Sequence, residues 1–104
     1  MKNENAKHTP GPWVINEEDG ICIDARLPDG RFIARVEADE SGSAEDGYIP
    51  YSEGKANAAL ISVAPDMYEI LNEVEEASRY RRPIKKATWL KVCEVLKKVD
   101  GVNR

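Results

Sequence analysis

The fold is decided by the stretch ANAALISVAPDMYEILNEVEEA, residues 56–77. Its apolar or small side chains recur at steps of four and three, which places them on one face of a helix for about six turns. These residues are Ala56, Leu60, Val63, Met67, Ile70, Val74 and Ala77. Pro65 lies off this face, and the periodicity keeps its phase across it. Proline cannot donate to the carbonyl of Ile61 and its ring crowds that carbonyl, so we predict one helix over residues 53–79 that kinks at Pro65.

Residues 13–38, which precede this helix, have the pattern of a β-meander. Ile21, Ile23 and Ala25 alternate with the residues between them, the period-two pattern of a half-buried strand. The segments EEDG at residues 17–20 and LPDG at residues 27–30 are typical of tight turns. We therefore predict three short antiparallel strands, joined by these two turns.

The C-terminal part, residues 83–100, has the pattern of a second helix. Trp89, Val92, Leu96 and Val99 give it an apolar face, and Gly101 is a typical stop signal. A sheet this small needs a helical cover to be stable. We predict a single α+β domain over residues 1–104, in which the meander packs on a hairpin of the two helices. We expect Trp13 and Trp89 in the core, and any apolar surface left uncovered to favour a homodimer.

Two segments lie outside these elements. Residues 1–12 are polar and end in Pro-Gly-Pro, and we expect them to form a flexible leader in which His8 has no packed partner. Residues 39–52 begin with a small, acidic run without apolar periodicity, which predicts a mobile loop. The carboxylates of this loop that we consider as a docking surface are Asp39, Glu40, Glu45 and Asp46.

Composition narrows the class of protein. The 104 residues are 41% hydrophobic and 33% charged, as expected of an ordinary soluble domain. No apolar run approaches the roughly 18 residues of a membrane span, and the N-terminus lacks the apolar core of a secretory signal. Cys22 and Cys93 lie far apart in sequence, so we expect free thiols. We expect a cytoplasmic protein that does not contact a membrane.

Charge is strongly segregated along the chain. Residues 1–78 carry a balance of −11 and residues 79–104 a balance of +7, within a net charge of −4. Five cations cluster around one tyrosine within eight residues. The members of this basic segment are Arg79, Tyr80, Arg81, Arg82, Lys85 and Lys86.

Three interpretations of the basic segment remain open. It could be a solvated connection between helices, neutralised by nearby glutamates at positions 69, 73, 75 and 76. It could bind nucleic acid, with cations on phosphates and Tyr80 stacked on a base, although the overall acidity of the chain argues against this. Either this segment or the acidic loop could instead dock on another protein.

Catalytic chemistry has little support in the sequence. His8 is the only histidine, and it lies in the leader. One histidine and two distant cysteines do not form a metal-binding pattern, and no glycine-rich phosphate loop is present. The acidic clusters fall in predicted turns, where two carboxylates cannot acquire separate pKa values. We therefore expect neither an enzyme nor a cofactor.

Two motifs resemble a known group of proteins. The opening HTPGPW, residues 8–13, and the segment ANAALISVAPD, residues 56–66, with the aliphatic helix after it, resemble a signature of small phage and prophage proteins. In such proteins Thr-Pro-Gly-Pro-Trp precedes a short sheet region, and an Ala-Asn-Ala segment leads through aliphatic residues to Ala-Pro-Glu/Asp. The resemblance implies a phage-related accessory protein and carries no catalytic residues over to this chain.

These observations lead to one hypothesis and one alternative. The first is a non-enzymatic phage or prophage accessory protein that binds a host or phage protein and inhibits a defence or regulatory component. The alternative is a small nucleic-acid-binding regulator that uses residues 79–86.

Overall fold

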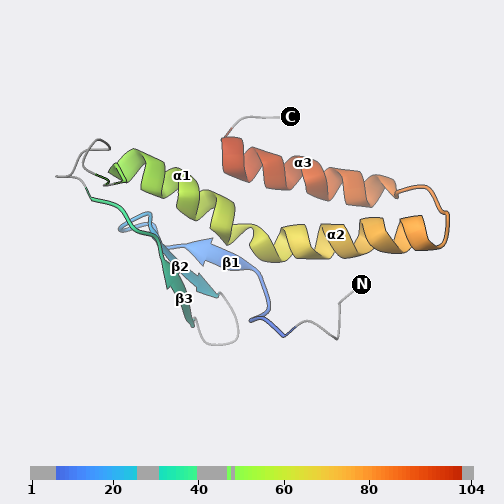
Figure 1. The fold of residues 1–104 in the computed structure, drawn as a ribbon, viewed down its shortest axis with the longest axis horizontal. Coiled ribbons are helices and arrows are strands. Elements are labelled where there is room, and N and C mark those ends of the chain that lie inside the picture. Colours follow the sequence, from blue (N-terminus) through green and yellow to red (C-terminus); the bar gives the residue numbers. More distant parts are fainter. Residues whose placement is uncertain (1–6, 26–30, 40–46, 48, 102–104) are drawn as a thin grey trace.

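The computed structural model describes residues 7–25, 31–39, 47 and 49–101. It has a small sheet at one end and a helical hairpin that extends from it, with overall dimensions of 51 × 31 × 23 Å (Figure 1). The strands are β1 (Trp13–Ile15), β2 (Cys22–Ala25) and β3 (Phe32–Arg35), and the helices are α1 (Tyr51–Ser62), α2 (Ala64–Arg79) and α3 (Lys86–Asp100). The predicted α+β class, with a three-stranded meander and a C-terminal helix, is confirmed.

The sheet is antiparallel, in the order β1-β2-β3. Ile15 pairs with Ile23 of the central strand, which pairs on its other side with Ala34. The first turn forms where EEDG predicts it. Its Asp19 carboxylate accepts the backbone N–H groups of Ile21 and Cys22, both at 3.0 Å, and Gly20 supplies the positive φ of 73° that the turn requires.

A first hydrophobic core lies between the sheet and α1. Its buried members are Ile21, Ile23, Val36 and Ala58, with Trp13, Ile15, Ile33, Ala38 and Tyr51 packed around them. Gly54 of α1 is buried against Ala38, and a Cβ at this glycine would lie 2.5 Å from the Cβ of Ala38. The Tyr51 hydroxyl also donates a hydrogen bond to the carbonyl of Asp19. These contacts fix α1 on the sheet.

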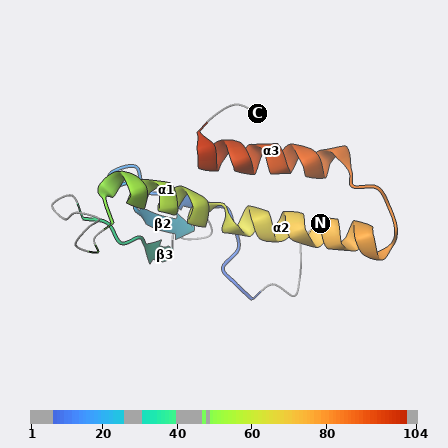
Figure 2. The ribbon, with the colours of Figure 1, turned by 45° about the horizontal axis from the view of Figure 1, so that its top comes forward.

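A second core lies between α2 and α3, which run antiparallel side by side (Figures 1 and 2). Its buried members are Val63, Ile70 and Val95, with Met67, Val74, Val92 and Val99 packed around them. The molecule therefore has two cores, one at each end. Val63, whose side chain is fully buried, lies where the two ends join.

The predicted single helix over residues 53–79 is two helices in the structure. They meet at Val63, which has φ −93° and ψ 6° and belongs to neither. Pro65 lies in the first turn of α2, where its missing N–H would have no helical partner in any case. The proline therefore helps to start a second helix and does not kink a continuous one.

The two helices also face different neighbours. In α2 the predicted apolar face packs on α3 as expected. In α1 it does not: Ala56 is exposed and Leu60 is 48% exposed, because Gly54 and Ala58 face the sheet instead. The small side chains at these two positions let the backbone of α1 approach the sheet closely.

Three further expectations need correction or fall outside the described residues. Trp89 is 53% exposed, not in the core, because α3 turns Val92, Val95 and Val99 toward α2. His8 does have packed partners, since its ring stands edge-on to that of Tyr68 at 4.8 Å. The Trp13 indole donates to the carbonyl of Thr9 at 3.1 Å. Residues 1–6 of the predicted leader, the predicted turn at residues 27–30, and residues 40–46 and 48 of the predicted loop lie outside the described part of the chain.

Candidate functional site

The basic segment forms the connection between α2 and α3, at the end of the molecule opposite the sheet (Figure 1). We call residues 79–86 the basic tip. Its backbone is held by hydrogen bonds from Arg81 N–H to the Ser78 carbonyl (3.2 Å) and from Arg82 N–H to the Ala77 carbonyl (2.8 Å). Arg81 has a φ of 53°, in the left-handed region. The tip is therefore a closed turn with a defined path.

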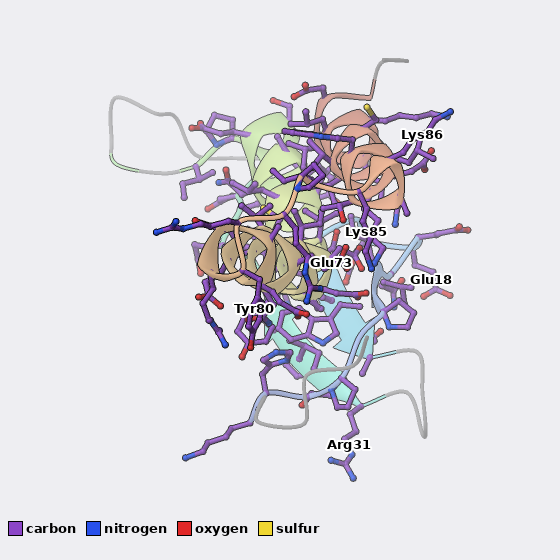
Figure 3. The ribbon with its side chains drawn as sticks, turned by 90° about the vertical axis from the view of Figure 1, so that its right-hand side faces the viewer. Glu18, Arg31, Glu73, Tyr80, Lys85 and Lys86 are labelled. Carbon is purple, nitrogen blue, oxygen red and sulfur yellow. The ribbon has the colours of Figure 1, made fainter. Side chains whose placement is uncertain are left out.

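Two arginines of the tip lie over the ring of Tyr80. The guanidinium carbons of Arg79 and Arg82 lie 5.6 and 5.0 Å from the centre of its ring, within the range of cation–π contacts. Figure 3 faces this end of the molecule and shows Lys85 and Lys86 near the start of α3. All six predicted residues of the basic segment are exposed at this end of the hairpin; Arg79 and Arg82 gather around Tyr80 beside α2, whereas Lys86 lies beside α3.

Only one of the five cations is neutralised within the described part of the chain. Arg79 forms a two-point ion pair with Glu75, one turn earlier on α2. This pair raises the pKa of Arg79 and lowers that of Glu75. Both side chains are more than half exposed, so the pair contributes little stability. Across the described residues, no carboxylate pairs with the cations Arg81, Arg82, Lys85 and Lys86.

Two of the four glutamates expected to neutralise the tip, Glu69 and Glu73, bind residues of α3 outside it. Lys91 of α3 donates to Glu69 at 2.9 Å and also to Glu73, and the Thr88 hydroxyl donates to Glu73 at 2.6 Å. Burial alone would raise the pKa of Glu73, but the bonds from Lys91 and Thr88 outweigh it and lower that pKa. The interpretation of a self-neutralised connection therefore holds for Arg79 alone.

Several residues of the tip are locally unfavourable choices. Lys85 is the N-cap of α3 and Lys86 its first residue, with no acidic residue in the first turn and no side-chain cap. The partial positive charge of a helix N-terminus disfavours cations there. A non-glycine residue in the left-handed region, such as Arg81, also carries a conformational cost. Departures from local preference that gather at one surface are expected at functional sites.

Asp39, the described member of the second predicted surface, lies at the end of the molecule that carries the sheet. Asp39 follows β3, and its N–H bonds to the Ile49 carbonyl at 2.9 Å, which draws together the ends of the segment between them. The remaining residues proposed for that surface, Glu40, Glu45 and Asp46, lie outside the described residues. The basic tip and Asp39 therefore lie at opposite ends of the molecule.

The edge of the α2–α3 hairpin that carries Glu73 was missed by sequence reasoning. Two shallow depressions lie along it, of about 240 and 320 Å³. Glu73, Thr88 and Lys91 come together only because α2 and α3 pack in a particular register, which no local pattern encodes. Charge was the sequence signal that could have revealed this edge, because lysines recur in α3 and glutamates recur in α2.

A metal-binding cluster and a membrane-spanning helix are both absent from the described residues. No group of three or more His, Cys, Asp or Glu side chains there has the arrangement of a metal site. None of the described helices has the length and apolar character required to cross a bilayer.

Comparison with known proteins gives one match. No curated protein and no solved structure matches the chain. One family model covers nearly all of it, from residue 1 to residue 101. The chain therefore belongs to the family described as Salmonella phage P22 protein Y8K6.

Proposed function

We propose that this phage protein is a non-enzymatic accessory protein that binds another protein through its basic tip. The partner would be a host or phage protein with an acidic surface. One observation carries the proposal: four exposed cations without carboxylate partners among the described residues stand on a closed turn at the end of a projecting hairpin. Desolvating them against carboxylates of a partner would supply the neutralisation that the described part of the chain does not provide.

The proposed biological effect follows from the family and from this surface. A small phage protein that covers an acidic patch on a host defence or regulatory component would block access to that patch. Such an interaction would take place in the bacterial cytoplasm. Charge attraction between the tip and its target would mainly raise the association rate and the selectivity.

The alternative partner is a nucleic acid. In its favour, Tyr80 is half exposed and flanked by two guanidinium groups, an arrangement that base stacking and phosphate contact can use. Against it, the glutamates of α2 begin directly behind the tip, and the chain has a net charge of −4. A duplex longer than the tip would meet those carboxylates.

A charge-reversal pair tests the proposal. Lys85→Glu/Lys86→Glu replaces the two cations at the start of α3 with carboxylates. Carboxylates interact favourably with the partial positive charge of a helix N-terminus, so the fold should be retained. Lys7→Glu/Lys97→Glu makes the same change of charge at two exposed lysines outside the tip. Affinity capture from an infected-host lysate identifies a partner, and its purified form is then titrated with each variant.

We expect the tip variant to bind that partner at least about tenfold more weakly, with the control variant close to wild type. Equal binding by both variants would contradict the proposal. A parallel titration with random duplex DNA at about 50 and 200 mM salt separates the alternative, because a nucleic-acid binder shows tight binding at low salt that weakens steeply.

A further inference from the structure

The smaller of the two depressions, of about 240 Å³, reaches from the α2–α3 hairpin into the basic tip, and we call it the tip depression. Two cations of the tip without carboxylate partners among the described residues, Arg82 and Lys85, line it. Arg81 and Lys86 do not line it, and Figure 3 shows Lys86 apart from Lys85 and Glu73. The depression therefore divides the four cations into two pairs, each with one arginine and one lysine.

The charges around the tip depression are one carboxylate short of balance. The charged side chains that line it are three cations and two carboxylates, with a formal balance of +1. Lys91 donates to Glu73, so these two charges are neutralised within the hairpin. Glu76 then offsets only one of the two cations Arg82 and Lys85. A ligand group with a single negative charge would complete the balance, whereas a group with two negative charges would exceed it.

The uncharged lining of the tip depression suits the stem of a side chain. Ala77, Pro83 and Ala87 supply apolar contact. Thr88 is 2% exposed, and its hydroxyl donates to Glu73 at 2.6 Å, so its proton is not available to a ligand. Pockets for whole small molecules usually measure about 300–1,000 Å³, and this space is smaller. A carboxylate on a short methylene stem matches the size, the charge and the lining.

We propose that the tip depression receives one glutamate or aspartate side chain of the partner protein, with its carboxylate bound by Arg82 and Lys85. This inference rests on the proposed function and deepens it, because it names the group that the partner presents. Charge-assisted hydrogen bonds to a carboxylate are about twice as strong as neutral ones, and they strengthen where water is excluded. Arg81 and Lys86 act at longer range, mainly on the association rate.

Phosphate groups fit the tip depression less well than a carboxylate does. A phosphorylated side chain carries a charge of about −1.5 to −2 at pH 7, which is more than the lining balances. A phosphate of nucleic acid carries one charge but brings further phosphates along the strand. Those phosphates would lie near Glu73 and Glu76, which line the same depression. The charge of the site therefore favours an acidic side chain of a protein.

Nuclear magnetic resonance titration of the full chain tests the site, because shifts of backbone amide signals locate a bound ligand. The probe is the capped peptide acetyl-Ala-Ala-Glu-Ala-Ala-amide, and the control peptide has glutamine in place of glutamate. We expect the amide signals of Ala87 and Thr88, which line the depression, to shift with the glutamate peptide at millimolar concentration. The absence of these shifts, or equal shifts with the glutamine peptide, would overturn the proposal.

The two cation pairs provide matched variants. Arg82→Gln/Lys85→Gln removes the two unpaired charges that line the depression, and Arg81→Gln/Lys86→Gln removes the same number beside it. We expect the first variant to bind the glutamate peptide at least about tenfold more weakly and the second only about twofold more weakly. Equal weakening in both variants would overturn the proposal, and so would tighter binding of inorganic phosphate or a single-stranded DNA hexanucleotide.

The same variants separate this inference from the proposed function. A partner whose affinity falls on charge reversal at Lys85 and Lys86, but falls equally for the two glutamine variants, would leave the proposed function standing and refute the tip depression. A glutamate peptide that binds as expected, with partner binding unchanged by charge reversal, would contradict the proposed function and the assignment of this group to a partner.

Discussion

Gly54 shows how a single residue sets the distance between a helix and the sheet. A side chain there would meet Ala38, whose Cβ lies 2.5 Å from the position of an added Cβ. Gly54→Ala should therefore destabilise the fold by about 1–3 kcal/mol, the usual cost of overpacking, despite the better helix propensity of alanine. Urea unfolding measures this change.

The matching test of Gly54 is a second substitution at the contact. Ala38→Gly removes the methyl group that an added Cβ would meet, so Gly54→Ala should be less destabilising in an Ala38→Gly background than in the wild type. Equal costs in both backgrounds would show that the close approach at Gly54 does not determine stability.

Glu73 should make stability depend on pH. Bonds from Lys91 and Thr88 lower the pKa of Glu73 in the folded state. A carboxyl with a lowered pKa stabilises the fold above its unfolded value, about 4.3, and this contribution is lost as pH falls through the folded value. The stabilities of wild type and Glu73→Gln, measured by thermal unfolding, should therefore differ at pH 7 by about 1–2 kcal/mol, and the difference should shrink as pH falls below the unfolded value. A difference that persists unchanged to pH 3 would rule out this role of Glu73.

At the scale of elements, the start of α3 carries an avoidable cost. Lys86 occupies the first helical position, and the first turn has no acidic residue. Lys86→Glu should stabilise the protein by about 0.3–1 kcal/mol through the helix dipole, while Lys97→Glu in the last turn should destabilise it by a similar amount. Denaturant midpoints give both values, and a destabilised Lys86→Glu variant would mean that Lys86 makes a structural contact.

The elements themselves were largely predictable, because their signals are local. The turn at residues 17–20 and the alternation of Ile21, Ile23 and Ala25 identify a hairpin within a few residues. The break at Val63 was not predictable from periodicity, because a proline in the first turn of a new helix leaves the spacing of apolar residues unchanged. Which face of α1 packs on the sheet depended on Gly54, a residue that an apolar count ignores.

For the candidate site, too, local features were predictable from the sequence and long-range contacts were not. The clustering of Arg79 to Lys86 is visible in the sequence because these residues are neighbours along the chain. Their lack of carboxylate partners is not visible, since it depends on Lys91 capturing Glu69 and Glu73 across the hairpin. Pairing between helices is decided by their register, which local patterns leave open.

At the scale of the whole molecule, the two cores should respond separately to substitution. Val95 belongs to the α2–α3 core and Ile23 to the core under α1. Val95→Ala should raise amide hydrogen exchange mainly in α2 and α3, and Ile23→Ala mainly in the sheet and α1, because local opening follows the cooperative unit that loses contacts. A uniform rise over the whole chain for either variant would mean a single cooperative unit.

Because the two cores are separate and meet at Val63, the length of the hairpin can change independently of the sheet. Seven residues added to α2 and seven to α3 would extend each helix by about two turns, or about 10 Å, and would leave every contact of the sheet in place. The height at which the cations stand above the sheet can therefore change in evolution, or by engineering, without redesign of the base on which the hairpin is mounted.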